Sequence, residues 1–206
     1  MELNILELCP NHAFGYKAEH SAGAHTKLME YEFATVDLTP YDVLVITDFA
    51  DQEYLYKHKK KVEQFLSEGK IIVFCGHLFR TWLPGCMPMM PKKIHSHQDY
   101  LVEVPEDSPI FKDVKVEDMV YTKGVAGFFA RGYYFPPQNA EICLTFTDGK
   151  VISYIDRETT NGTIIVHAGR NLFGYAQRKN TSNLITKQFI EVLEKETARR
   201  KGVRAE

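Results

Sequence analysis

Short runs of consecutive apolar residues alternate with longer mixed segments in the first half of the chain. Their length is typical of strands, and the run at 70–74 (KIIVF) has no polar alternation, which indicates burial on both faces, as in a parallel sheet between helices. The sequence predicts strands over 3–8 (LNILEL), 28–38, 42–49 (DVLVITDF) and 70–74. The intervening stretch 9–27 is polar and glycine-containing, and we expect it to be mostly loop, with at most a short helix near 23–28.

The segment between the last two of these runs has the pattern of an amphipathic helix. Asp51 occupies an N-cap position, and Gly69 suits the residue that follows a helix end. Four apolar residues fall on one helical face, namely Leu55, Val62, Phe65 and Leu66. Strand, helix and strand at this spacing predict a βαβ unit.

The second half of the chain changes character, with short strand-like runs separated by Gly, Pro and Asp. Asp148-Gly149 suits a tight hairpin turn, and a helix is expected from about 181 to 199. The predicted strands lie within 99–104, 119–129, 141–149, 150–156 and 162–169. No repeat, linker or low-complexity segment interrupts the chain, so we expect a single domain over residues 1–206.

The order of these segments resembles the class I glutamine-amidotransferase-like superfamily, most closely its trehalose-utilisation-like and non-amidotransferase branches. The resemblance is carried by YDVLVITDF, FLSEGKIIVFCGH, LPG, DSPIFKDV and TDGKVISY followed by NGTIIVHAGRN, from about residue 41 onwards. It implies an α/β fold, a flavodoxin-like three-layer sandwich with a mainly parallel central sheet and antiparallel hairpins in the C-terminal half.

The amidotransferase catalytic pattern is incomplete. In that family the nucleophilic cysteine lies in G-x-C-x-G, whereas Val73 and His77 flank Cys75 at the glycine positions. His167 corresponds to the catalytic histidine, but Gly169 stands where a glutamate would orient the imidazole. The resemblance therefore implies a non-catalytic or atypical domain, and the sequence leaves open whether the protein is an enzyme.

Polar side chains follow three of the predicted parallel strands. Ligands gather at the carboxyl ends of such strands, so Asp48, Gly76 and Arg170, with Trp82 from the following loop, are candidates to bind a small polar ligand. The alternative is that strands simply end at the surface with polar residues.

The same strand ends supply candidates for covalent catalysis. A cysteine-dependent amidase or hydrolase would use Cys75 as nucleophile with His77 or His167 as base. However, Cys75 is in phase with Ile71 and Val73, and free cysteine is often buried, so core packing is the competing interpretation.

A third hypothesis is a metal-dependent enzyme. His95, His97 and Asp99 alternate, and on an extended strand all three would point to one side and could bind a metal ion. The chain contains no phosphate-binding or dinucleotide-binding glycine motif, so no cofactor is expected.

Composition and charge limit the kinds of binding partner and the cellular compartment that we expect for this protein. A net charge of −2 favours neither nucleic acid nor an anionic membrane surface. No apolar run approaches the roughly 20 residues that span a bilayer, and the first residues do not resemble a signal peptide. Four widely spaced cysteines are typical of reduced thiols. We expect a cytoplasmic protein whose partner is a small polar ligand or another protein, with the domain acting alone or as a subunit of a homo- or hetero-oligomer.

Overall fold

The structure is a computed structural model that describes residues 3–10 and 25–203. Its centre is an eight-stranded sheet in the order β2-β1-β3-β4-β10-β9-β8-β6. The first five strands are parallel, and the last three run antiparallel to their neighbours. The strands are β1 (Ile5–Cys9), β2 (His25–Met29), β3 (Val43–Ile46), β4 (Ile71–Cys75), β6 (Val102–Glu103), β8 (Glu141–Phe146), β9 (Val151–Asp156) and β10 (Thr163–His167).

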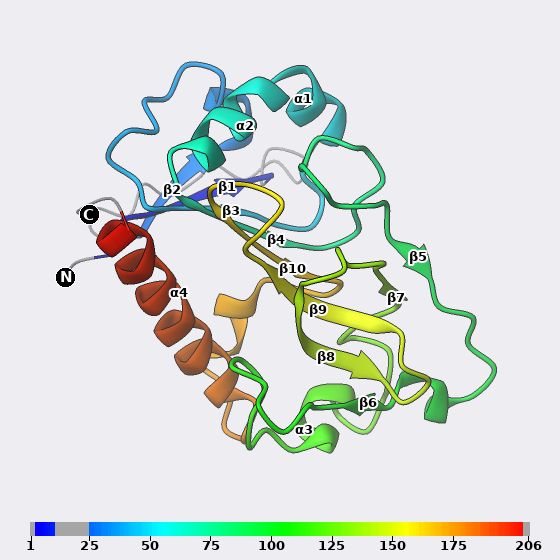
Figure 1. Ribbon diagram of the computed structural model, residues 1–206. Helices are drawn as coiled ribbons and strands as arrows, with labels where there is room; N and C mark the ends of the chain where they lie inside the picture. The colour runs from blue at the N-terminus through cyan, green and yellow to red at the C-terminus, as the bar shows by residue number, and fades with distance from the viewer. Residues whose placement is uncertain (1–2, 11–24, 204–206) are drawn as a thin grey trace.

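Helices cover both faces of this sheet (Figure 1). Helices α1 (Gln52–Lys57) and α2 (Lys59–Ser67) lie on one face, and α4 (Asn183–Val203) lies on the other. The remaining elements are α3 (Val116–Val120), the 3-10 turns η2 (Glu30–Glu32), η3 (His97–Tyr100) and η4 (Leu172–Tyr175), and a small antiparallel pair, β5 (Met90–Pro91) with β7 (Gly132–Tyr133). The predicted fold class, a flavodoxin-like three-layer α/β sandwich, is confirmed. The assignment of residues 1–206 to a single domain stays a prediction.

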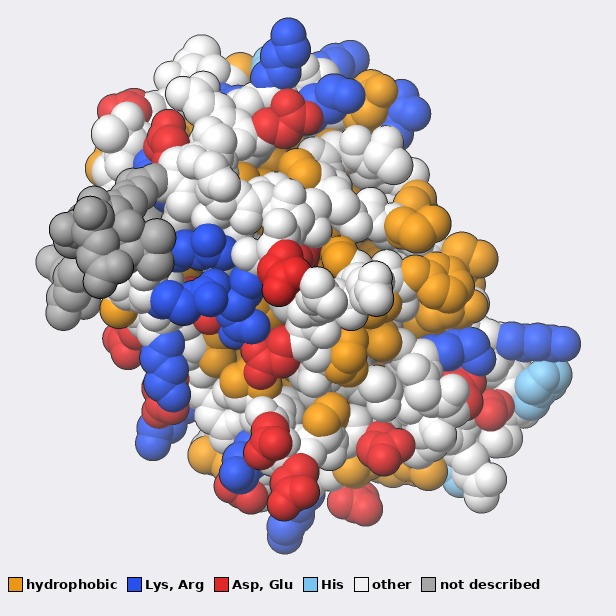
Figure 2. All heavy atoms as spheres, in the orientation of Figure 1, with side chains coloured by type: hydrophobic (Ala, Val, Ile, Leu, Met, Phe, Trp, Pro, Cys, Tyr) orange, Lys and Arg blue, Asp and Glu red, His pale blue; other side chains and the backbone are white. Residues whose placement is uncertain are grey.

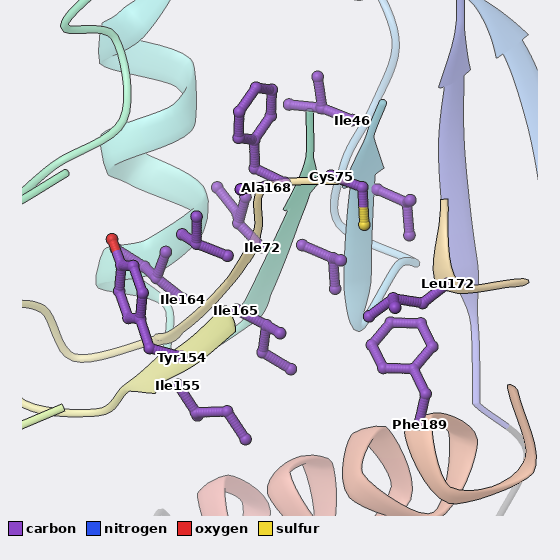
Figure 3. Packing of buried hydrophobic residues seen from close by; sticks show 14 of the residues in the cluster. Ile46, Ile72, Cys75, Tyr154, Ile155, Ile164, Ile165, Ala168, Leu172 and Phe189 are labelled. Atoms are coloured by element: carbon purple, nitrogen blue, oxygen red, sulfur yellow. The ribbon is translucent and has the colours of Figure 1, made fainter. Parts of the chain in front are cut away.

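The core lies on both sides of β4, which pairs in parallel with β3 and with β10. Every residue of these three strands is buried. Figure 3 shows the alternation of a pleated strand: Ile72 and Ile164 point toward the α2 side, whereas Ile165 points toward Phe189 of α4. The unbroken apolar runs in the sequence therefore reflect burial on two faces.

The predicted βαβ unit is present, with one difference in the helix. Asp51 caps α1 by accepting a hydrogen bond from the Tyr54 amide at 3.0 Å, and Gly69 follows α2 with φ of 73°. The helix is interrupted at His58, whose φ of −103° and ψ of 15° are not helical. Even so, the four apolar residues of the predicted stripe are all buried.

Two predicted strands are wrong in position or type. Strand β2 pairs with β1 from His25 to Met29, earlier than the predicted 28–38, and the chain then turns through η2. The segment 119–129 is not extended, because α3 ends at Val120 and Lys123, Gly124 and Gly127 all have positive φ. An extended strand excludes that conformation.

The surface in Figure 2 carries acidic and basic side chains interspersed, in keeping with the net charge of −2. Hydrophobic side chains reach the surface in the region of β5 and β7, where Met90 and Phe135 are 44% and 51% exposed. Across residues 3–10 and 25–203, the structure has no helix with the length and hydrophobicity needed to cross a bilayer.

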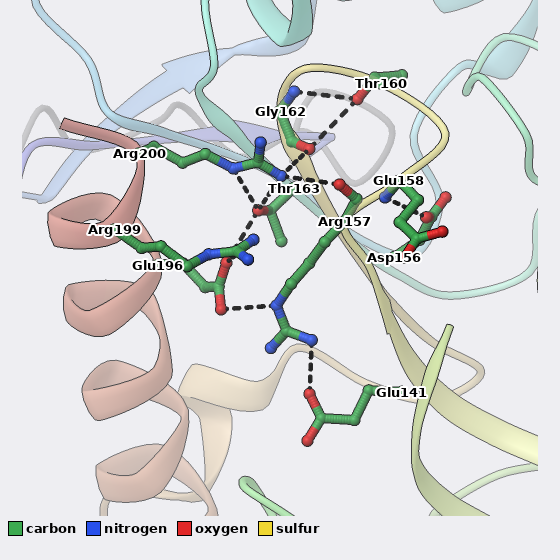
Figure 4. Close-up of polar contacts among 10 residues, drawn as sticks. All are labelled: Glu141, Asp156, Arg157, Glu158, Thr160, Gly162, Thr163, Glu196, Arg199 and Arg200. Carbon is green, nitrogen blue, oxygen red and sulfur yellow. Dashed lines mark hydrogen bonds and ion pairs between the residues drawn. The ribbon is translucent and has the colours of Figure 1, made fainter. Parts of the chain in front are cut away.

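An ionic cluster fastens α4 to the sheet at the end where β10 begins (Figure 4). Arg157 donates to Glu196 of α4 at 2.8 Å and to Glu141 of β8 at 2.7 Å. The second carboxylate oxygen of Glu196 accepts a hydrogen bond from Thr163 at 3.0 Å, and Arg200 donates to the Gly162 carbonyl at 2.7 Å. Glu196 is 6% exposed, so its charge depends on these partners.

We predict that Glu196→Ala lowers the free energy of unfolding by about 2 kcal/mol, because the change removes one of the two carboxylate partners of the half-buried Arg157 guanidinium and the acceptor of the Thr163 hydroxyl. Urea unfolding would measure the loss. The matched control is Glu194→Ala on the exposed face of the same helix, for which a change within about 0.5 kcal/mol is expected. Equal effects of the two substitutions would contradict a stabilising role for the cluster.

Candidate functional site

A cavity of about 310 Å³ lies at the carboxyl ends of β3, β4 and β10. Asp48 and Phe49 line it after β3, His77 after β4, and Ala168 to Arg170 after β10, with residues 127–131 opposite. The structure thus brings Asp48, His77 and Arg170, three of the residues predicted from the sequence, around one space. Parallel strands end at the same edge of a sheet, which is why residues so far apart in sequence converge.

Gly76, after β4, lies in close contact with Asp48, after β3. Its φ is 144°, and a Cβ at this position would overlap the Asp48 side chain and lie 3.3 Å from the Asp48 Cα. The Gly76 amide donates to the His167 carbonyl at 2.8 Å, and its carbonyl accepts from the Tyr134 hydroxyl at 2.6 Å. Gly76 therefore shapes the site through its lack of a side chain.

The Asp48 carboxyl lies partly buried between two basic side chains. Burial raises its pKa, and the nearby charges of His77 and Arg170 oppose that rise. An acid, an imidazole and a guanidinium therefore act on one another across the cavity. Such a set can donate and accept hydrogen bonds to a bound molecule on several sides.

The loop after β4 is held by a residue that sequence reasoning missed. Gln52, 4% exposed, donates to the His77 carbonyl at 2.7 Å. Its oxygen accepts from the amides of Phe79 and Arg80 at 3.0 and 3.2 Å and from the Trp82 indole at 3.3 Å. No local pattern links position 52 to these positions. Sequence reasoning also missed Tyr134, which holds the same loop. Its hydroxyl donates to the Gly76 carbonyl and accepts a hydrogen bond from the Leu78 amide at 3.1 Å.

Trp82 does not line the cavity. Its side chain is 1% exposed and packs edge-on against Phe74, with 5.4 Å between ring centroids. The structure places Trp82 in the core, where the indole hydrogen bond to Gln52 satisfies its one polar atom.

Cys75 and His167 lie beneath the cavity on the α4 side of the sheet, and neither lines it. Cys75 is fully buried next to Leu172 and Phe189 (Figure 3), and burial raises the pKa of its thiol to about 12. His167 pairs with Cys75 in the strand register, but neither of its ring nitrogens has a hydrogen-bond partner among the described residues. Cys75 and His167 are therefore not hydrogen-bonded to each other.

The His167 ring is enclosed by aromatic side chains. Ring centroids lie 5.4 Å from Phe129 and 5.8 Å from Phe111. Burial lowers the pKa of His167 to about 3, so the imidazole is neutral at physiological pH.

The segment with His95, His97 and Asp99 is not an extended strand, which is the conformation in which all three side chains would point to one side. Ser96 caps η3, and Asp99 accepts hydrogen bonds from the amides of His95 and Ser96 at 2.7 and 2.8 Å, which lower the pKa of its carboxyl. The two histidines line a separate open hollow with Tyr100 and Tyr121. Within the parts of the chain that the structure describes, no three His, Cys, Asp or Glu side chains are grouped to hold a metal ion.

Comparison with solved structures finds a likeness in fold to a glutamine amidotransferase. A crystal structure of a glutamine amidotransferase from Thermotoga maritima superposes with a TM-score of 0.48 and 8% sequence identity, covering 96% of this chain and 94% of that one. Neither a protein-family model nor a curated protein sequence matches the chain. The trehalose-utilisation-like branch stays a prediction.

We predict that acid weakens the fold through His167. The pKa of His167 is about 3 in the folded protein and 6.5 in the unfolded chain. Between these two pH values, the unfolded chain is protonated at this residue and the folded protein is not. The free energy of unfolding therefore carries no penalty from His167 above pH 6.5. As the pH drops below 6.5, protonation of His167 in the unfolded chain lowers the free energy of unfolding by up to about 1.4 kcal/mol per pH unit. His167→Leu would remove this slope between pH 6.5 and 4.5 in urea unfolding, whereas the exposed control His97→Leu would retain it. An unchanged slope in His167→Leu would contradict the assignment.

We also predict that iodoacetamide does not alkylate Cys75 in the folded protein at neutral pH. The thiol is buried, and its raised pKa leaves almost no thiolate. Peptide mass mapping after labelling with and without urea would measure modification at this position. Labelling that is as fast in the native protein as in urea would show an accessible, activated thiol instead.

Proposed function

We propose that the protein binds a small polar ligand at the carboxyl ends of β3, β4 and β10, as a non-catalytic or atypical domain of glutamine-amidotransferase-like fold without covalent catalysis by Cys75. The observation that carries the proposal is the cavity itself, which gathers Asp48, His77 and Arg170 while Cys75 stays in the core. Its volume of about 310 Å³ falls at the lower end of the range for ligand pockets, which suits a small molecule.

The lack of protein partners for the Arg170 guanidinium supports a role in ligand binding over a purely structural role. Its guanidinium forms no ion pair or hydrogen bond with any residue in 3–10 or 25–203, although its charge acts on Asp48. By contrast, Arg80 and Arg157 are paired with carboxylates at 2.8 Å or less. An unpaired guanidinium facing a cavity is suited to a ligand oxygen.

The rim of the cavity adds an apolar surface and a strained backbone. Phe49 is 75% exposed and Phe128 is 44% exposed, and both line the cavity. Phe49 also has a φ of 68°, a costly conformation for a residue other than glycine. Such strain is commonly retained at binding sites, where it fixes a side chain in position.

The test is a binding screen with amino acids, hydroxycarboxylic acids, polyols and sugar phosphates, first by thermal shift and then by calorimetry. We predict that Asp48→Asn and Arg170→Gln each weaken binding of a compound that the wild type binds by about tenfold or more, the effect of removing a charge-assisted hydrogen bond. The control is Arg199→Gln, whose side chain lies far from the cavity on α4 and pairs with Glu196.

Two outcomes would overturn the proposal. One is that no compound of the panel binds the wild type. The other is that each compound binds Asp48→Asn and Arg170→Gln as tightly as the wild type, which would place its binding elsewhere on the protein.

A further inference from the structure

A second cavity of about 420 Å³ adjoins the first. The two share Phe128, Phe129 and Arg170 in their walls, so they are neighbours. The far side of the second cavity is formed by α3 and η4 and includes Met119, Tyr175 and Arg178. Together the cavities extend from the ends of β3 and β4 to the start of the segment that leads into α4.

The second cavity has two guanidinium groups and one carboxylate in its wall, so its charged side chains leave an excess of one positive charge. Neither Arg170 nor Arg178 forms an ion pair with a residue that the structure describes. Arg178 lies over the Tyr175 ring at 6.0 Å from its centroid, a contact that holds the guanidinium against the wall. The one carboxylate in the lining, Asp118, accepts hydrogen bonds from the amide and hydroxyl of Thr181 at 2.9 and 2.5 Å. These bonds lower its pKa and keep it charged, so two cations and one anion line this cavity.

Tyr175 lies against Arg178, and Arg170 lines the same cavity. Burial raises the pKa of the Tyr175 hydroxyl, and the charges of Arg178 and Arg170 oppose the rise. That hydroxyl makes no hydrogen bond within residues 3–10 and 25–203. A pair of cations and a hydroxyl donor therefore face one space, which is the set of groups that binds phosphate or carboxylate oxygens.

We propose that the second cavity binds the anionic group, phosphate or carboxylate, of an elongated ligand whose uncharged polar part lies at Asp48 and His77. The inference rests on the proposed function, since it assigns the two cavities to one molecule. Arg170, common to both, would contact the anion from one side and Arg178 from the other. The middle of the ligand would cross Phe128 and Phe129.

The first experiment uses simple anions. Inorganic phosphate and acetate are titrated by calorimetry at low ionic strength into the wild type, Arg178→Gln and the control Arg199→Gln. We expect saturable binding of at least one anion, with a Kd of about 1 mM or tighter, that Arg178→Gln weakens by about tenfold and Arg199→Gln leaves unchanged. Far-UV circular dichroism checks that both variants are folded.

The second experiment uses matched pairs, glycerol with glycerol 3-phosphate and glucose with glucose 6-phosphate. The phosphorylated member should bind the wild type about tenfold more tightly, and Arg178→Gln should abolish that advantage. Asp48→Asn should weaken both members of a pair, because it changes the other cavity.

The outcomes separate the two claims. The anion site is overturned if no anion binds saturably, or if Arg178→Gln and Arg199→Gln weaken anion binding equally. In that case the proposed function still stands if uncharged compounds bind the wild type and Asp48→Asn weakens their binding. Anion binding that depends on Arg178, with no compound affected by Asp48→Asn, overturns the assignment of both cavities to one ligand and the proposed function with it.

Discussion

The central constraint on this structure is the enclosure of β4 on all four sides. Its two edges pair with β3 and β10, and its two faces pack toward α2 and α4. A strand enclosed in this way can carry only side chains that tolerate burial, and the small thiol of Cys75 is one of them. The carboxyl end of the strand, where the backbone leaves the sheet, is then the only part of it that can contribute to a binding site.

The site at this edge is built as much by backbone and buried polar groups as by the residues that line it. Gly76 brings the ends of β3 and β4 together, and the two side chains that fix its loop, Gln52 and Tyr134, are themselves buried and satisfied. Each forms at least two hydrogen bonds to the loop backbone, so the loop has little freedom to change shape. A pocket held in this way is suited to binding with little reorganisation.

The arginines show how charge is divided between structure and function. At the end of the sheet where β10 begins, Arg157 and Arg200 are fixed by carboxylate, hydroxyl and carbonyl oxygens and join α4 to the sheet. At the opposite end, Arg170 and Arg178 face cavities without such partners. A guanidinium without a protein partner contributes little to stability, and its position beside a cavity is the physical basis for proposing an anionic ligand.

The sequence alone determined the βαβ unit and the double burial of β4, and it put Asp48, His77 and Arg170 at strand ends, because these features depend on local periodicity and on the direction of parallel strands. It could not determine that Trp82 and His167 point into the core. Nor could it assign Phe128, Phe129 and Arg178 to a cavity wall or link Gln52 to the loop after β4. These contacts join residues as far apart in sequence as Phe111 and His167, and only the packing of the whole chain decides which side chains then meet.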